Sequence, residues 1–240
     1  QTCALPILTA QNLSPELPEN AVQKVEPHVH AIVAFPNVLI VVGSKATLVV
    51  DTGMGPRNGA LVAREAAKLA PSNALYLTTT HFHPEHASGA QAFPSGTKVV
   101  RCNVQQQEVD ALGAQTVDRF RQNAAYAPFL TGEIKLGHAD ILFDREHSID
   151  LGGITAHLMC LGVTHTKGDE EVFVPEDSVL ISGDVVQNKL APALPMMGAS
   201  PKSWIAVLDE LQKLNPKIVL PDHGNFGDGS SIAQEKAFLV

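Results

Sequence analysis

The segment from Thr80 to His86, THFHPEH, constrains this chain more than any other. Three imidazoles and one carboxylate, all groups that bind metal ions, lie within six residues. The segment follows Ala74–Thr80, an apolar and β-branched run that is typical of a buried strand. Because Pro84 prevents a continuous helix through it, we expect a loop that joins a strand to a helix. Such a loop can carry ligands for zinc or its neighbours in the first transition row.

The spacing within this loop indicates two clusters of ligands. In an extended chain, His81 and His83 point to the same side. The turn at Pro84 lets Glu85 and His86 face a second point nearby, so one short loop could serve two metal ions. The alternative is a chance cluster of surface histidines. The position at the end of a strand, where loops carry chemistry, favours the metal site.

Length and charge restrict the function classes. A chain of 240 residues can form one domain or two closely packed halves. With 17 basic and 25 acidic residues the net charge is −8, which disfavours nucleic acid as a partner. No apolar run reaches the length that spans a bilayer. We therefore expect a small-molecule substrate, no nucleic-acid partner and no membrane span, and the oligomeric state stays open.

The start of the chain and its cysteines bear on the compartment. The sequence begins at Gln1 without a methionine, so a signal peptide was removed or the chain was trimmed. We expect export to the bacterial periplasm or secretion, with the cytoplasm as the alternative. Cys3, Cys102 and Cys160 contain no C-x-x-C pair. They leave open one disulfide with a spare thiol or three free thiols.

A histidine or an aspartate recurs at the end of short hydrophobic runs. These residues are Asp51 after Thr47–Val50, His81 after Ala74–Thr80, His165 after Ile154–Leu161, Asp184 after Val179–Ile181 and His223 after Lys217–Leu220. Each run is typical of a buried strand. Further strands are expected at Val29–Phe35, Val38–Val42, Thr97–Cys102, Ile141–Phe143, His147–Leu151 and Val172–Val174.

The strand-rich and helical patterns alternate twice along the chain. Helices are expected at Asn58–Ala70, Ala87–Phe93, residues 103–128, Pro201–Leu214 and Ser230–Val240. Residues 1–25, dotted with proline, are expected to form a surface arm. The rest reads as a single domain with two halves, about 26–135 and 136–240. These halves would pack sheet to sheet with helices outside and ligand loops along one edge.

Other polar residues have two interpretations. Asp51 is either a turn former or an acceptor for the N–H of a ligand imidazole. His28 and His30 would share one strand face, and they either line a pocket or make ordinary surface contacts. The segment Leu190–Met197 either walls a hydrophobic pocket or packs in the core. The remaining histidines, His138, His147 and His157, are expected to be surface or packing residues, with a role as metal ligands as the less favoured alternative.

The order of the candidate residues resembles that of the metallo-β-lactamase superfamily. The features that carry the resemblance are Asp51 after an early strand, the H-x-H-x-D-H-like loop 81–86, then His165, Asp184 and His223. They cover roughly residues 28–230. The resemblance implies an α+β fold, an αββα sandwich of two face-to-face sheets with helices on the outer faces.

The resemblance also implies two Zn²⁺ ions per chain. It assigns the first ion to three imidazoles, those of His81, His83 and His165. It assigns the second ion to Glu85, His86 and His223, and Asp184 would bridge the ions or join the second. Asp51 would bind no ion itself and would accept the N–H of a ligand imidazole.

One residue departs from the family pattern. The family usually has aspartate where this chain has Glu85. The additional methylene moves the carboxylate by about 1.5 Å. Glu85 would then bind the second ion, bind it weakly or shift the attacking water.

The implied reaction is hydrolysis. Two close cations lower the pKa of a bridging water towards neutrality, so hydroxide is available at pH 7. Glu85 would orient it or take up its proton, and Asp184 would hold the second ion. No serine or cysteine nucleophile competes, since Ser182 is not in a G-x-S-x-G elbow. We expect a compact or cyclic ester or amide as substrate, of the β-lactam or lactone type.

Three alternatives remain at this level. One is a mononuclear-iron enzyme similar to persulfide dioxygenases, and another is a thioesterase of the glyoxalase II type. The latter usually carries an additional C-terminal helical region, and little follows His223 here. The third is a non-catalytic metal protein, whose zinc site would be closed by four protein ligands.

Overall fold

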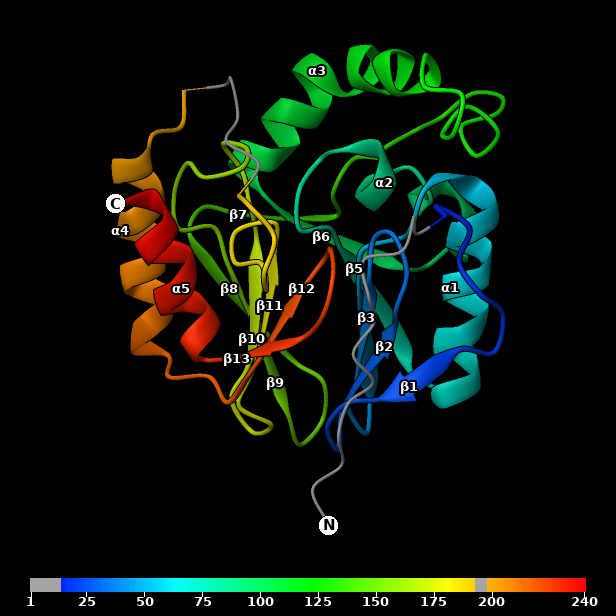
Figure 1. Cartoon of the computed structure of the whole chain (residues 1–240). Helices are drawn as coiled ribbons and strands as arrows, with labels where there is room; N and C mark the ends of the chain where they lie inside the picture. The colour runs from blue at the N-terminus through cyan, green and yellow to red at the C-terminus, as the bar shows by residue number, and fades with distance from the viewer. Residues whose placement is uncertain (1–13, 193–197) are drawn as a thin grey trace.

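The computed structural model describes residues 14–192 and 198–240. Two parts of the chain lie outside the described residues. They are residues 1–13 of the expected arm, which include Cys3, and residues 193–197 of the segment Leu190–Met197, which include Met196 and Met197. The chain forms two β-sheets with helices on either side (Figure 1). Within the described ranges, no helix is both long and apolar enough to cross a membrane.

The first sheet contains seven strands in sequence order. They are β1 (Val22–Lys24), β2 (Val29–Ile32), β3 (Val38–Val42), β4 (Ala46–Val50), β5 (Ala74–Thr78), β6 (Lys98–Cys102) and β7 (Ile141–Phe143). Strands β1 to β4 are antiparallel, whereas β4 to β7 run parallel.

The second sheet contains six strands in the order β13-β12-β11-β10-β9-β8. They are β8 (Glu146–Asp150), β9 (Thr155–Met159), β10 (Glu171–Val174), β11 (Val179–Gly183), β12 (Ile218–Pro221) and β13 (Gly227–Asp228). Only the β11–β12 pair is parallel among the neighbours described.

Side-chain alternation along the strands builds the layers. In β3, Leu39 and Val41 point into the core between the sheets, while Ile40 points to the opposite face. That opposite face is covered by α1 (Gly55–Leu69), whose Leu61 and Val62 join the same cluster as Ile40. A sheet that is apolar on both faces must be covered on both, which gives the sandwich its outer helix layer.

The outer face of the second sheet is covered by α4 (Pro201–Lys213) and α5 (Ser230–Leu239). Trp204, Leu208 and Leu211 of α4 are fully buried against Leu180 of β11 and Val219 of β12. The remaining helices are α2 (Pro84–Ala87), the 3₁₀ turn η1 (Ala90–Ala92) and α3 (Asn103–Arg121), which lies at the top of the view in Figure 1. The predicted αββα sandwich is confirmed.

Several predicted boundaries were wrong. The expected helix Ala87–Phe93 is replaced by α2, which ends at Ala87, and by η1. Helix α2 can begin at Pro84 because proline is tolerated in the first helical turn. The helix expected to run to residue 128 ends at Arg121. The boundary between the two halves was predicted at about residue 135. Strand β7 still pairs with β6 of the first sheet, so the chain changes sheet later, between Phe143 and Glu146. The short strands β1 and β13 were not predicted.

Candidate metal centre

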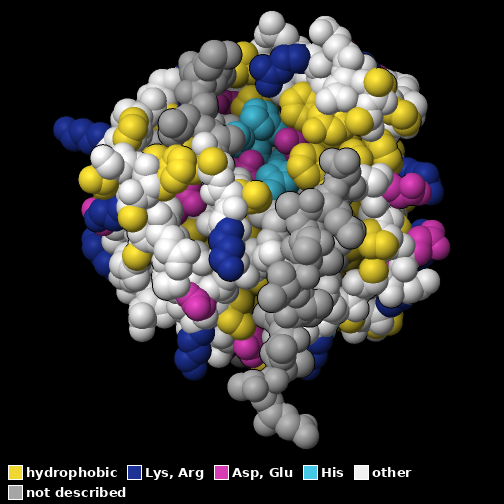
Figure 2. Space-filling model, in the orientation of Figure 1, with side chains coloured by type: hydrophobic (Ala, Val, Ile, Leu, Met, Phe, Trp, Pro, Cys, Tyr) yellow, Lys and Arg dark blue, Asp and Glu magenta, His cyan; other side chains and the backbone are white. Residues whose placement is uncertain are grey.

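The candidate ligands gather where the carboxyl ends of the parallel strands meet. Asp51 follows β4 and the histidine loop follows its parallel neighbour β5. In the other sheet, Asp184 follows β11 and His223 lies just beyond the parallel β12. Parallel neighbours end at the same edge of a sheet, so each pair of segments is placed side by side. Figure 2 shows histidine side chains in a hollow of this face, flanked by acidic and hydrophobic ones.

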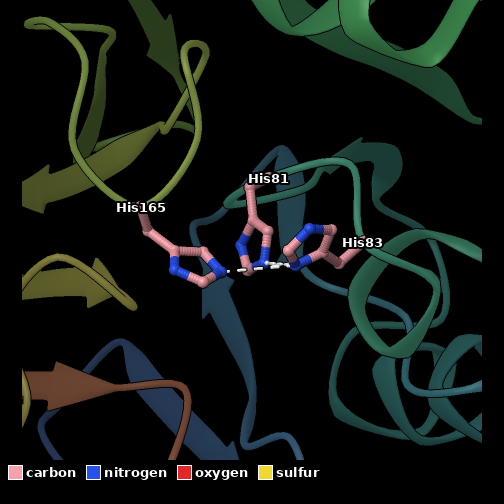
Figure 3. A group of neighbouring side chains, drawn as sticks. All are labelled: His81, His83 and His165. Atoms are coloured by element: carbon pink, nitrogen blue, oxygen red, sulfur yellow. Dashed lines mark hydrogen bonds between the residues drawn. The ribbon is translucent and has the colours of Figure 1, made fainter. Parts of the chain in front are cut away.

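The first cluster consists of His81, His83 and His165. Nδ1 of His83 lies 3.0 Å from Nε2 of His81 and 3.3 Å from Nε2 of His165. The three rings converge from two separate loops (Figure 3). Burial and the neighbouring imidazoles lower the pKa of both His81 and His83 well below its usual value. These imidazoles are therefore neutral, the form that binds a metal ion.

The second cluster consists of His86, Asp184 and His223. Oδ1 of Asp184 lies 3.5 Å from Nε2 of His223, and Oδ2 lies 3.5 Å from Nε2 of His165. One carboxylate oxygen thus faces each cluster. Burial on its own raises the pKa of Asp184, but His223 and His165 outweigh this and hold it below its usual value.

Glu85 joins a third group, with His81 and His86. Its Oε1 lies 3.8 Å from Nε2 of His86. Burial raises the pKa of Glu85 to about 8. The resemblance assigns Glu85, Asp184 and His223 to one ion. Among the described residues, no group of potential ligands contains all three. The longer side chain therefore sits nearer the His81 side of the centre.

In the group of His81, Glu85 and His86, two buried atoms have no hydrogen-bond partner among the described residues. They are Nε2 of His86 and Oε2 of Glu85. A buried polar atom left without a partner costs about 1–3 kcal/mol. A divalent cation bound by imidazole and carboxylate would satisfy both atoms. The donor set present therefore fits the metal that the family pattern implies.

Behind the ligands, two aspartates hold His86. Its Nδ1 donates to Oδ2 of Asp51 at 2.9 Å and lies 3.3 Å from Oδ2 of Asp222. Thr80 links both carboxylates, donating its hydroxyl to Asp222 at 2.6 Å and its backbone N–H to Asp51 at 2.8 Å. With Nδ1 occupied, Nε2 of His86 faces the centre. Asp222 was missed from the sequence, although it lies beside His223 at the end of a strand.

The other five histidines lie outside these clusters. His28 donates from Nδ1 to Asp177 at 2.9 Å, and His157 pairs with Ser148 at 2.7 Å. The remaining three are His30, His138 and His147, and none of them belongs to a described group of potential ligands.

An aromatic wall lines the centre and was not predicted. It consists of Phe35, Phe120 and Tyr126. The ring centroid of Phe35 lies 4.5 Å from that of His223, and the centroid of Phe120 lies 6.0 Å from that of His83. Tyr126 stacks between the phenylalanines at 5.6 Å from Phe120 and 6.2 Å from Phe35. The wall thus runs from one histidine cluster to the other.

The comparison with known families agrees with this geometry. Residues 31–223 match the family model of the metallo-β-lactamase superfamily. The chain belongs to this superfamily. The predicted resemblance is thereby confirmed.

Two curated superfamily relatives are hydrolases by name. The chain is 25% identical over 217 residues to a linear primary-alkylsulfatase of Pseudomonas sp., which covers 78% of this chain. The chain spans only 41% of the length of that relative. It is 22% identical over 233 residues to a metallo-β-lactamase type 2 of Elizabethkingia meningoseptica, covering 90% of this chain and 84% of the relative.

Solved superfamily structures share the fold. A metallo-β-lactamase from Pontibacter korlensis superposes with a TM-score of 0.73 at 21% identity, covering 93% of this chain and 99% of that one. The DIM-1 metallo-β-lactamase superposes with a TM-score of 0.70 at 19% identity, covering 93% and 98%. At these identities the likeness establishes the fold alone.

Proposed function

We propose that this superfamily member is a zinc-dependent hydrolase that opens an ester or amide carbonyl by attack of water. The position of Asp184 carries the proposal. Its two oxygens each lie 3.5 Å from a histidine of a different cluster. A carboxylate placed in this way can serve two cations at once, as dinuclear hydrolytic sites require.

The first cluster supports catalysis over a purely structural role. It offers three imidazoles, His81, His83 and His165. Structural zinc sites are closed by four protein ligands, whereas catalytic sites keep a position open for water or substrate. When bound, two zinc ions would lower the pKa of a water towards neutrality and polarise the substrate carbonyl.

The protein groups around that water have distinct roles in this proposal. Glu85 has one oxygen near His86 and one buried oxygen without a partner among the described residues. It orients the water or accepts its proton. Asp51 and Asp222 fix the ring of His86 through Nδ1. Asp184 keeps the two clusters at a constant separation.

The aromatic wall favours a compact substrate with an apolar part. Phe120 and Phe35 lie beside His83 and His223. Apolar and aromatic linings with a few polar groups are typical of small-molecule sites. A β-lactam or lactone ring bound against this wall would present its carbonyl to the histidine clusters.

A second candidate is hydrolysis of an alkyl sulfate ester. The observation that favours it is the relative named as a linear primary-alkylsulfatase. The guanidinium of Arg119, an exposed residue, lies 5.9 Å from the ring centroid of Phe120. A cation beside an apolar wall suits a substrate with an anionic head and an alkyl chain.

One purified sample can decide between these functions. Elemental analysis gives the metal content, and nitrocefin, a simple lactone and dodecyl sulfate are assayed on the same sample. We expect about two zinc ions per chain and turnover of nitrocefin or the lactone. Turnover of dodecyl sulfate alone would select the second candidate. About one iron per chain without hydrolysis would overturn both and favour an iron oxygenase.

A further inference from the structure

Two cysteines from different sheets meet inside the protein. Cys102 is the last residue of β6 in the first sheet, and Cys160 directly follows β9 in the second. Their exposed fractions are 0% and 8%. The two Sγ atoms are 2.6 Å apart, although the residues are separated by 58 positions in the chain.

This separation is short for two unbonded sulfur atoms. Carbon atoms in van der Waals contact lie at about 3.5–4.0 Å and sulfur is a larger atom, whereas a disulfide bond is about 2.0 Å long. The distance of 2.6 Å lies between these values and nearer the bond. A shift of roughly 0.6 Å would therefore bring Cys102 and Cys160 to bonding distance.

We propose that Cys102 and Cys160 form a disulfide that joins the two sheets. The oxidant is an external disulfide bond, either that of oxidised glutathione or that of an oxidised protein dithiol oxidase. The thiolate of one cysteine attacks it, releases one reduced thiol and forms a mixed disulfide. The second cysteine then displaces the other reduced thiol. Two protein thiols are oxidised and one external disulfide is reduced, so electrons and protons balance.

The bond would fix the start of α3, which is hydrogen-bonded to both metal-binding loops. Cys102 also caps α3, since its Sγ accepts the backbone N–H of Gln105 at 3.4 Å. The side-chain amide of Gln105 donates to the carbonyls of Thr79, two residues before His81, and Gly168, three after His165. Anchoring the start of α3 to β9 therefore restrains the ends of both loops.

The surroundings suit a permanent bond better than a reversible switch. The contact with Cys160 and burial raise the pKa of Cys102, so little thiolate exists in the folded protein. Exchange then takes place while the chain folds, before the cysteines are enclosed. Export stays a prediction for this chain, and an oxidising compartment is where such a bond forms. The inference is independent of the proposed function.

Counting thiols tests the proposal directly. The full chain with Cys3→Ser is refolded in a mixture of oxidised and reduced glutathione and then unfolded in guanidinium with a thiol reagent. We expect no reactive thiol before reduction, two after reduction and a peptide map that joins the segments of Cys102 and Cys160. Two reactive thiols before reduction would overturn the proposal. So would a map of the parent chain in which Cys3 pairs with either cysteine.

A second variant separates the bond from simple packing. Cys160→Ser is added to Cys3→Ser, and both proteins are folded with and without reductant. Without reductant, we expect Cys160→Ser to lower the Tm by about 10 °C, because the disulfide closes a long loop in the unfolded chain. With reductant, most of this difference should vanish. An equal difference in both conditions would show that Cys160 acts by packing alone and that no bond forms. If Cys160→Ser does not fold, the thiol count on Cys3→Ser still decides.

Discussion

Nδ1 of His86 donates a hydrogen bond to Oδ2 of Asp51 across 2.9 Å, and both side chains are fully buried. The pair connects the end of β4 to α2, the short helix that follows β5. Because the bond occupies one ring nitrogen, it decides which nitrogen of His86 faces the metal centre. Thr80 holds the same carboxylate from its backbone N–H.

Replacing this acceptor should weaken metal binding. We expect Asp51→Asn to lower zinc affinity by about 10–100-fold, measured by competition with a chromophoric chelator. Asp177→Asn is the matched control, because Asp177 accepts from His28 at the same 2.9 Å but away from the centre. Equal loss of zinc in both variants would contradict the role of Asp51.

Removing one imidazole of the first cluster should remove one ion. Nδ1 of His83 lies within 3.3 Å of both other histidines of its cluster. We expect His83→Ala to lose about half of the bound zinc and at least about a hundredfold in kcat/KM. His138→Ala, at an exposed position, should keep both. Full activity of His83→Ala would show that the site is assigned wrongly.

The close approach of Gly168 to α3 should make this glycine sensitive to substitution. A Cβ at residue 168 would lie 2.3 Å from the backbone nitrogen of Gln105, so the loop that carries His165 would have to move. We expect Gly168→Ala to lower kcat/KM at least about tenfold, since small displacements of catalytic groups are costly. Gly153→Ala is the control, because that Cβ would meet nothing within 4 Å and adds only backbone strain at φ +83°. Comparable activity loss in both would mean that steric overlap at 168 is not the cause.

The aromatic wall should govern substrate affinity more than turnover. Phe120 touches no atom of the reacting carbonyl in the proposal but lies 6.0 Å from His83. We expect Phe120→Ala to raise KM for nitrocefin about tenfold with little change in kcat, as loss of uniform binding does. Leu142→Ala, an exposed apolar residue on β7, should leave both constants unchanged. An unchanged KM in Phe120→Ala would remove the wall from the binding site.

A buried carboxyl group on α5 should make stability depend on pH. Burial raises the pKa of Glu235 to about 7, and its Oε1 has no partner among the described residues. A carboxyl group with a raised pKa holds its proton more firmly in the folded state, so stability falls as pH rises from about 4.5 towards 7. Glu235→Gln should therefore gain Tm over the parent at pH 8 but not at pH 4. Glu210→Gln, at a partly exposed position on α4, should show no such trend. A constant difference across this range would rule out the ionisation of Glu235 as the cause.

The sequence predicted the parts of this centre that depend on local pattern. The ends of hydrophobic strands located Asp51, His81, Asp184 and His223, because a buried strand and the polar residue after it are neighbours in the chain. Asp222 was missed because its partner Thr80 is 142 residues away, in the segment that follows β5 of the other sheet. The contact of Cys102 with Cys160 was equally hidden, because only the packing of the two sheets defines it.

The aromatic wall was missed for a similar reason. Phe35 lies in the turn between β2 and β3, whereas Phe120 and Tyr126 lie at the end of α3 and beyond it. In the sequence these side chains look like ordinary apolar residues. The boundary of the first half was placed too early because β7 is short and follows a long connection from α3.

Each histidine cluster draws ligands from both sides of the point where the chain changes sheet. His81 and His83 meet His165, and His86 meets Asp184 and His223. An ion bound at either of these clusters would therefore connect two parts of the polypeptide, neither of which supplies all the ligands of that cluster. If the chain were cut between Phe143 and Glu146, neither fragment could complete the first or the second cluster, and only the group of His81, Glu85 and His86 would stay on one fragment. Recovery of tight zinc binding on mixing the two fragments would then show that the fragments associate.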